Sequence, residues 1–365
     1  MQLKNLLTRT PSAQPSRVHS KRTAHNRGDE MAHPLENVPL NQKLWKRHLK
    51  EIINHSNWQH GVLHKGVSNK TMYEREEFYF RCFLELREHG YKLDPRALGN
   101  RHIRFLVGCW VKRELKPATI QTYLSFLSVF ARWIGKHGLV MAPQWYVDDP
   151  ALVTRSYVAK NDKSWCANDV EAVQVIAKIA EYDIHVAAQL DIQSAFGLRV
   201  KESVMFHPHE AVVPSTVTGI ENPVAEFYIQ VARGTKGGRV RHVALDSEIK
   251  RAAIERAKHL ATKPASHIGC PDRTLKQSMR RFYYILEKFG ITKTQLGVTA
   301  HGLRHQYAND QFEALTGVAA PLRSGHAINA EDDSNARLAI AADLGHARQR
   351  ISSAYLGGKF LDSRE

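Results

Sequence analysis

The chain has 365 residues, enough for two domains, and 43% of them are hydrophobic, which is ordinary for a globular protein that buries a core. It carries 52 lysines and arginines against 36 acidic residues, so its formal net charge is +16 and its pI is about 9.7. This balance favours a nucleic acid as partner over another ligand, and no apolar run approaches the roughly 18 residues of a membrane-spanning helix, so we expect no membrane association.

Cysteine and histidine spacing gives no sign of a metal or redox site. The four cysteines are scattered without a C-x-x-C pair, and the 20 histidines include no H-E-x-x-H motif. Sparse cysteines suit a reducing compartment, and the first residues lack the apolar segment of a secretory signal. We therefore expect a cytoplasmic protein that needs neither a metal nor another cofactor.

The N-terminal part of the chain divides into a tail, a helical domain and a linker. Residues 1–42 form a basic, polar segment that is expected to be flexible, either as a DNA-binding arm or as a solvated leader. Residues 43–147 show apolar positions at helical spacing and are expected to form a helical domain. Residues 148–164 combine mixed charge with little periodicity, which is typical of a linker.

Within the helical domain, turn and capping residues separate three expected helices. One ends at Gly90, Asp94 caps a second that carries Leu98, and a third begins near Thr119. The apolar stripe of the third helix, from Ile120 to Ile134, is interpreted as core packing.

Residues 165–365 are expected to form a second domain, mostly helical with a small β-hairpin. Asn168 to Glu171 has capping-box spacing and should open its first helix, and a later helix from about 183 to 196 should end at Gly197. Two expected strands, 226–232 and 239–245, flank the glycine-rich turn 234–238. A further helix is expected over about 273–289.

Four separated motifs of this second domain carry residue types suited to phosphate chemistry. They are Gly-Leu-Arg-Val-Lys-Glu at 197–202, Lys236 at the tip of the hairpin, His-Gly-Leu-Arg-His at 301–305, and Leu-Gly-His at 344–346, followed nine residues later by Tyr355. Any one of these short motifs would be weak evidence, whereas all four in this order form a specific signal.

Their order resembles that of the phage-integrase family of tyrosine recombinases, over about residues 165–356. A weaker likeness to the last helix of the family's core-binding domain covers 116–133. The resemblance implies that 43–147 is a SAM-like helical core-binding domain and that 165–365 is an α+β catalytic domain. The implied catalytic residues are Tyr355, Arg199, Arg304, His301, His346 and Lys236, with Glu202 and His305 in supporting roles.

The chemistry of phosphodiester cleavage accounts for these residue types. Arg199 and Arg304 can bind the non-bridging oxygens, on which negative charge develops. Tyr355 would be the nucleophile, and Lys236 could protonate the departing sugar oxygen. His301 lies one helical turn from Arg304 and could assist proton transfer at the tyrosine.

His346 could bind the phosphate, Glu202 would orient its surroundings, and His305 would pack or support. Taken alone, each residue could have a purely structural role. Arg199 would be an ordinary salt-bridged arginine, Lys236 part of a soluble turn, and His346 a helix-capping group. The four motifs together favour the catalytic interpretation.

Two features depart from the family pattern. The interval from Arg304 to His346 is longer than the resemblance leads us to expect, and the excess is assigned to 317–335 as a surface insertion. Only ten residues follow Tyr355, whereas many members use a longer C-terminal segment to contact a neighbouring subunit.

Three other functions stay open. Metal-dependent DNA transposition would need a carboxylate cluster, for which Glu331 to Asp333, interpreted as a solvated loop, is the nearest candidate. A DNA-binding protein could use the same fold without cleaving, and a topoisomerase-like enzyme could use the same tyrosine chemistry.

The sequence thus predicts a site-specific recombinase that integrates or excises a mobile element through a 3′-phosphotyrosine intermediate, with Xer-like chromosome or plasmid dimer resolution as the alternative biology. The resemblance implies double-stranded DNA with specific recombination sites as partner, a homotetramer on that DNA, and accessory DNA-bending proteins as optional partners. It also implies a prokaryotic cytoplasm, with association with the nucleoid during the reaction.

Overall fold

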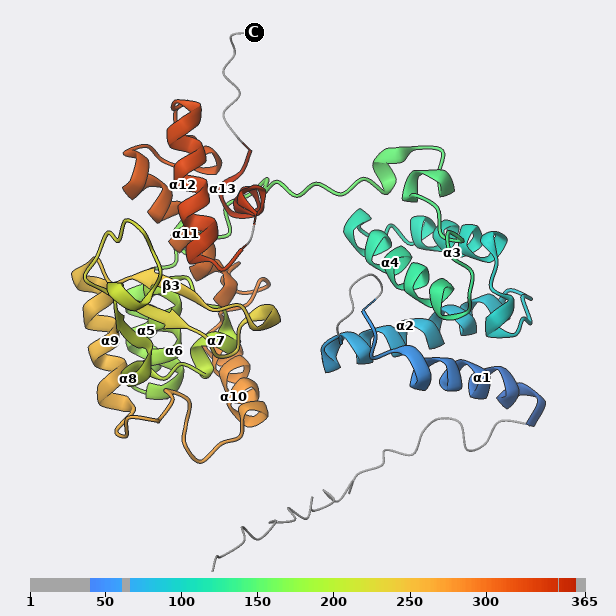
Figure 1. Ribbon diagram of the computed structural model, residues 1–365, viewed down its shortest axis with the longest axis horizontal. Coiled ribbons are helices and arrows are strands. Elements are labelled where there is room, and N and C mark those ends of the chain that lie inside the picture. The colour runs from blue at the N-terminus through green and yellow to red at the C-terminus, as the bar shows by residue number, and fades with distance from the viewer. Residues whose placement is uncertain (1–39, 61–65, 347, 359–365) are drawn as a thin grey trace, which may run out of the picture. The chain divides into compact units, whose positions relative to one another are not determined.

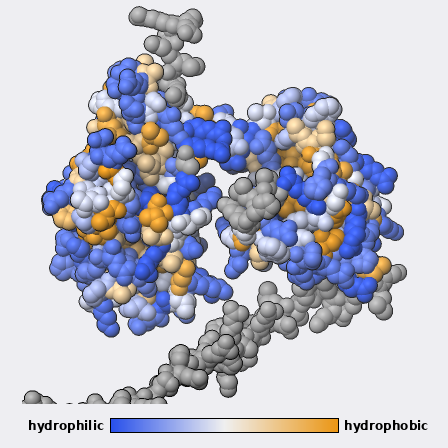
Figure 2. All heavy atoms as spheres, viewed as in Figure 1, coloured by the Kyte–Doolittle hydropathy of each residue, from blue (hydrophilic) through white to orange (hydrophobic). Residues whose placement is uncertain are grey.

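The computed structural model describes residues 40–60, 66–346 and 348–358, so that 1–39 of the predicted basic tail lie outside the described residues. The chain splits between Arg155 and Ser156 into two compact units. The visible face of each unit is mostly hydrophilic, with scattered hydrophobic residues (Figure 2). Among the described helices, none is both long and apolar enough to span a membrane.

Unit 1, up to Arg155, is helical throughout its described part (Figure 1). Its α-helices there are α1 (Leu40–Ser56), α2 (Asn69–Glu88), α3 (Asn100–Lys112) and α4 (Pro117–Trp133). The predicted stripe of α4 faces inward, since Ile120, Leu127 and Phe130 are buried among aromatic side chains of α2. This helical core is the one that the apolar periodicity predicts.

The predicted start of the second helix in unit 1 is corrected by the structure. Asp94 does accept a hydrogen bond from the backbone N–H of Arg96, but the element that it caps is the short 3-10 turn Pro95–Ala97. Leu98 is buried in extended backbone before α3 begins at Asn100. A capping residue followed by proline favours a first helical turn, and here the chain leaves the helical conformation after that turn.

Unit 2 is mostly helical around a small sheet, which confirms the predicted fold class (Figure 1). Its described helices are α5 (Ala172–Ala180), α6 (Ile184–Phe196), α7 (Val200–Val204), α8 (Pro208–Ala211), α9 (Glu248–Leu260), α10 (Leu275–Lys288), α11 (Ala300–Thr316), α12 (Ala330–Asp343) and α13 (Ser353–Leu356). Helix α6 has Asp183 as its N-cap and ends at Gly197 in the left-handed conformation, as predicted.

The sheet is antiparallel in the order β1 (Val212–Pro214), β2 (Phe227–Val231) and β3 (Arg241–Ala244). Strands β2 and β3 form the predicted hairpin, in which Ile229 pairs with Val243, and Ile229 also pairs with Val212 of β1. The three-residue β1 carries too little alternation to be found by a period-two pattern.

Two buried clusters fill the interior of unit 2. One joins α6, the sheet and α9 to α11, α12 and α13, and it includes Tyr307, Leu344 and Tyr355. The other packs α5 and α10 against the beginning of α11 around Trp165. Helix α11 therefore contacts both clusters along its length, and its first turns and the short α13 lie against each other.

Two local predictions in unit 2 are wrong. Asn168 ends a 3-10 turn, and α5 begins only at Ala172, because Asp169 adopts a left-handed conformation that interrupts the helix. The acidic run that begins at Glu331 is the first turn of α12 rather than a solvated loop. Acidic residues are favoured there by the helix dipole, and Asp333 is buried against Arg337.

A glycine in α11 allows its first turn to pack tightly against the chain before α5. A Cβ atom added to Gly302 would lie 2.5 Å from the carbonyl oxygen of Lys163 and 2.8 Å from the Trp165 ring. In contrast, a Cβ atom on Gly108 in α3 would meet nothing within 4 Å. Both glycines lie inside helices, so Gly108 is a matched control for the substitution of Gly302 by alanine.

We expect Gly302→Ala to destabilise the protein by about 1–3 kcal/mol, because the backbone of Lys163 must move. Gly108→Ala should stabilise it by about 1 kcal/mol, because alanine is the better helix former. Urea unfolding followed by circular dichroism measures both changes. A Gly302→Ala protein as stable as Gly108→Ala would contradict the close packing of α11 on this segment.

Candidate active site

A fully buried arginine lies at the centre of the motifs that the sequence singled out. Arg304 on α11 is 0% exposed, and its guanidinium donates to the carbonyl oxygens of Gly197 and Leu344. Its Nε also donates to the hydroxyl oxygen of Tyr355, at 3.3 Å. One side chain thus joins the ends of α6 and α12 to α13.

The buried Tyr355 side chain points its hydroxyl group into this cluster. The hydroxyl lies 3.4 Å from Nε2 of His346, and the Arg304 guanidinium carbon lies 5.7 Å from the centre of the tyrosine ring. His305 packs on the same ring, with 4.8 Å between ring centres, and His301 lies at 6.0 Å. Residues spread from 301 to 355 therefore surround a single phenol.

The second predicted arginine, Arg199, is held beside the first by a carboxylate. Glu202 is buried and accepts from both the backbone N–H of Arg199, at 2.8 Å, and its guanidinium, at 2.7 Å. The guanidinium of Arg199 also donates to the Leu344 carbonyl oxygen, at 3.3 Å, and its side chain is 23% exposed. Arg199 is thus fixed in direction while part of it stays open to solvent.

Arg241 on β3 completes this network, and the sequence analysis missed it. Its two terminal nitrogens donate to the two carboxylate oxygens of Glu202, at 3.0 and 2.8 Å, and its Nε donates to the Asp343 carbonyl oxygen, at 2.6 Å. Burial would raise the pKa of Glu202, but the hydrogen bonds and charges of Arg241 and Arg199 outweigh it and lower this pKa to about 2. Glu202 is therefore a permanent anion that binds two cations.

The signal that could have found Arg241 is its position in the strand. Along β3, Arg241 shares a face with Val243, which is fully buried, so alternation alone places this arginine on the inward side. A charged residue at an inward position of a strand needs a buried partner of opposite charge.

The three histidines near Tyr355 are held in their neutral form. Loss of solvation, followed by the charges of Arg304 and Arg199, lowers the pKa values of His301 and His346 to about 4, although His301 as a whole residue is exposed. Burial and the neighbouring His301 lower the pKa of His305 to about 3. A neutral imidazole can accept a proton, so His346, in contact with the phenol, can act as a base towards it.

Lys236 is the one predicted residue that is not in contact with the others. It lies in the exposed turn of the hairpin, and its charge contributes to the low pKa of His346. The base of this hairpin is anchored: Gly234 packs on the backbone of Lys201, and a Cβ atom there would be 2.7 Å from the Lys201 carbonyl oxygen. The hairpin thus presents an exposed cation near His346 from a fixed base.

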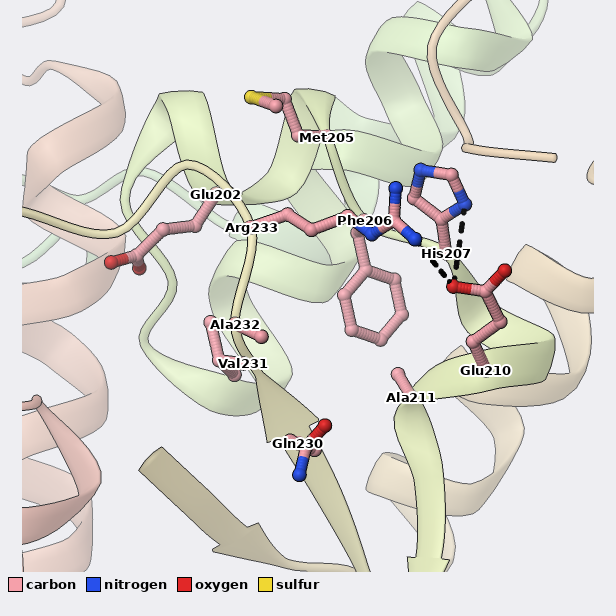
Figure 3. Close-up of a pocket in the computed structure, with 10 residues that line it drawn as sticks. All are labelled: Glu202, Met205, Phe206, His207, Glu210, Ala211, Gln230, Val231, Ala232 and Arg233. Carbon is pink, nitrogen blue, oxygen red and sulfur yellow. Dashed lines mark hydrogen bonds and ion pairs between the residues drawn. The ribbon is translucent and has the colours of Figure 1, made fainter. Parts of the chain in front are cut away.

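A small pocket beside this base, shown in Figure 3, has a structural explanation. Arg233, at the end of β2, forms an ion pair with Glu210, at 2.7 Å, and His207 lies 3.9 Å from the same carboxylate. The Glu202 carboxylate points away from this group. The ion pair between Arg233 and Glu210 therefore holds the chain after β2 on α8.

Asn309 is a second contributor that the sequence analysis missed. This fully buried side chain donates to the backbone carbonyl oxygens of His305, at 2.8 Å, and Tyr355, at 3.2 Å. It lies one turn after His305 on α11, so the H-x-L-R-H spacing continued by four residues points to it. Among the described residues, no group of three or more metal-ligating side chains occurs.

Comparisons with known proteins match the part of unit 2 that holds the first three of the four motifs, up to residue 310. Residues 156–310 match a family model described as Integrase, and no curated protein matches the sequence. A Tn1549 transposon integrase in complex with a circular intermediate DNA is similar in structure, with a TM-score of 0.52 and 15% identity over 87% of this chain and 96% of that chain. A lambda integrase dimer bound to a COC′ core site is similar with a TM-score of 0.50 and 15% identity, over 88% and 96%. The resemblance and the fold class are confirmed.

The electrostatics of the cluster lead to a pH prediction. In the DNA-free protein, His301 and His346 should titrate near pH 4 rather than near 6.5, because burial and two arginines disfavour the imidazolium. The unfolded chain binds these protons at higher pH, so they should reduce stability as the pH falls from about 6.5 to 4.

NMR titration of histidine-labelled protein measures the two values, and His301→Gln and His346→Gln assign the signals. Titration of either ring near pH 6.5 in the wild type would contradict the neutral site.

Proposed function

We propose that this chain, whose residues 156–310 match the Integrase family model, cleaves and rejoins double-stranded DNA through a covalent bond to Tyr355. The observation that carries the proposal is the contact of the Tyr355 hydroxyl with Arg304, at 3.3 Å, beside a second arginine, Arg199, that is partly open to solvent. A phenol between guanidinium groups is suited to attack a phosphate, since the cations stabilise both the phenolate and the phosphorane-like transition state.

In the proposed step, the Tyr355 oxygen attacks the scissile phosphorus. The new bond joins phosphorus to the tyrosine oxygen, the bond from phosphorus to the 5′ oxygen breaks, and the DNA is left with a 3′-phosphotyrosine and a free 5′ hydroxyl group. No oxidant or nucleotide is consumed, because the phosphotyrosine keeps the energy of the broken ester. The reverse attack by a 5′ hydroxyl group reseals the strand.

Two protons must move in this step. The phenol proton passes to a neutral imidazole, for which His346 is the nearest partner, at 3.4 Å, and the centre of the His301 ring lies 6.0 Å from that of the tyrosine ring. The departing 5′ oxygen takes up a proton, and we assign its donation to Lys236. Arg199 and Arg304 stay charged throughout and bind the non-bridging oxygens.

Several finer parts of the proposal rest on the family resemblance. They are the binding of specific recombination sites, a homotetramer that pairs two such sites, and the integration or excision of a mobile element. The two similar integrases named above are complexes with DNA, which supports DNA as the ligand here. Direct or inverted repeats in the DNA that flanks the gene would support the mobile-element role.

The metal-dependent alternative is less well supported by the residues present. Its nearest carboxylate cluster begins at Glu331, and there Asp333 is occupied by an ion pair with Arg337, at 2.7 Å. Glu202, the carboxylate beside the two arginines, is fully engaged by Arg199 and Arg241.

The proposal predicts that Tyr355→Phe binds DNA but forms no covalent complex. The substrate is a nicked recombination site, which traps the adduct when the short 5′ fragment diffuses away, and denaturing electrophoresis detects it. The wild type and the control Tyr182→Phe, an exposed tyrosine of the same unit, should both form the adduct in EDTA.

A covalent band from Tyr355→Phe would remove this tyrosine from the mechanism. Cleavage that EDTA abolishes and magnesium restores would favour the metal-dependent alternative, and binding without any adduct in the wild type would favour a non-cleaving DNA-binding protein.

A second prediction concerns Lys236 as the general acid. Cleavage expels a 5′ alkoxide, and a general acid is worth about 10²–10⁴-fold in such a step. Lys236→Ala should therefore be slow by about this factor on normal DNA. When sulfur replaces the 5′ bridging oxygen, the thiolate leaves without a proton, so the variant should cleave nearly as fast as the wild type.

The matched control is Arg239→Ala, which removes another exposed cation from the same hairpin. A loss of phosphate binding alone should slow cleavage of both substrates equally, as we expect for this control. Equal impairment of Lys236→Ala on the two substrates would show that Lys236 is not the acid.

A further inference from the structure

The helix that carries Tyr355 is too short to fix its own position. Helix α13 has four residues, Ser353–Leu356, and follows the 3-10 turn Gln349–Ser352 directly. At its end the N–H of Gly357 donates to the Ser353 carbonyl oxygen, at 3.2 Å. Isolated helices of this length are unstable, because the few hydrogen bonds of a single turn do not offset the cost of ordering it. The place of the Tyr355 hydroxyl must therefore come from contacts with the rest of unit 2.

The main contact of this kind is a buried arginine on α12. Arg337 is 1% exposed, and its guanidinium donates to the carbonyl oxygens of Gly357, at 3.3 Å, and Gly358, at 2.8 Å, just after α13. It also donates to the Ser353 hydroxyl group, at 3.3 Å. These contacts bracket Tyr355, two residues before it and two and three residues after it.

The arginine is itself fixed. Its Nε donates to Asp333, at 2.7 Å, one turn earlier on α12, and its guanidinium lies 5.9 Å from the centre of the Phe312 ring on α11. A buried guanidinium that is fixed in orientation can hold several acceptors at once through its planar group of N–H donors. We call this arrangement, in which Arg337 holds the chain on both sides of Tyr355, the bracket.

We propose that Arg337 is a positioning residue that fixes the Tyr355 hydroxyl relative to the two arginines of the site. This inference rests on the proposed function, since it assigns to Arg337 the alignment of the nucleophile in that reaction. Helix α12 ends at Asp343, directly before Leu344, whose carbonyl oxygen accepts from Arg304, so the helix that carries Arg337 leads into the site.

The other hydrogen bonds around α13 hold its beginning and Tyr355 itself. The backbone N–H of Ala159 donates to the Ser353 carbonyl oxygen, at 2.9 Å, and Asn309 donates to the Tyr355 carbonyl oxygen, at 3.2 Å. After Tyr355, Leu356 is fully buried and Gly357 packs against Leu322, where an added Cβ atom would lie 3.2 Å from the Leu322 backbone nitrogen. Neither contact supplies a donor to the carbonyl oxygens of Gly357 and Gly358. Loss of the guanidinium would leave the Gly357 and Gly358 carbonyl oxygens without this donor, and α13 could then turn about its anchored beginning.

Arg337→Lys tests the bracket. Lysine keeps a positive charge for Asp333, but its point-like ammonium group cannot hold the three acceptors around α13 together. A displacement of about 1 Å can cost roughly 100-fold in rate, so cleavage at saturating DNA should slow about 10–100-fold while the Kd for DNA stays within about twofold. The assay is single-turnover cleavage of a nicked site.

The second measurement does not depend on DNA cleavage. With 3-fluorotyrosine incorporated at position 355, the ¹⁹F spectrum of the wild type should show one narrow resonance, and Arg337→Lys should broaden it or split it. The control is Arg281→Lys, which alters an ion pair of the same length, 2.7 Å, with Asp183, away from α13. This control should leave both the spectrum and the rate unchanged.

Asp333→Asn keeps the guanidinium but removes its carboxylate partner, and it should change the cleavage rate and the ¹⁹F spectrum in the same direction by a smaller amount. This variant replaces Arg337→Lys in the test if Arg337→Lys does not fold. An unchanged ¹⁹F spectrum in a folded variant would overturn the inference, whatever the rate. A wild type that forms no adduct would contradict the proposed function, and the fluorine spectrum would still decide on the bracket.

Discussion

The structure of the site depends on one buried positive charge, the guanidinium of Arg304. A buried cation is costly unless its donors are matched, and here they bind the carbonyl oxygens of Gly197 and Leu344 and the hydroxyl group of Tyr355. Since those acceptors come from α6, the end of α12 and α13, three distant segments must meet at this point. The burial lowers the pKa of Arg304 to about 10, which still leaves it charged at neutral pH.

The remaining charges of the cluster follow from this constraint. A second cation, Arg199, can lie nearby only because the Glu202 carboxylate compensates it, and Arg241 holds that carboxylate with two hydrogen bonds. Burial, together with the positive charge of the two arginines, lowers the pKa values of His301 and His346 and keeps both rings neutral. In the proposed function, the same arrangement that lets two arginines lie close together also supplies neutral imidazoles as bases for the phenol and a positively charged surface that can bind a phosphate.

Local patterns in the sequence predicted the parts of the site that each lie in one element. The helix end at Gly197, the hairpin around Lys236, and the shared face of His301 and Arg304 all follow from short-range rules. Arg241, Asn309 and Arg337 were missed, because their roles depend on backbone groups and side chains that tertiary folding brings to them. The acidic turn at the start of α12 was misread for the same reason: its buried partner is visible only in the fold.

The central claim is that the phenol held by Arg304 becomes covalently bonded to DNA. The most direct measurement is mass spectrometry of the trapped complex after nuclease and protease digestion. The account predicts a single modified peptide that contains Tyr355, with a nucleotide attached through its 3′ phosphate. An adduct on another residue, or a linkage through a 5′ phosphate, would contradict the account.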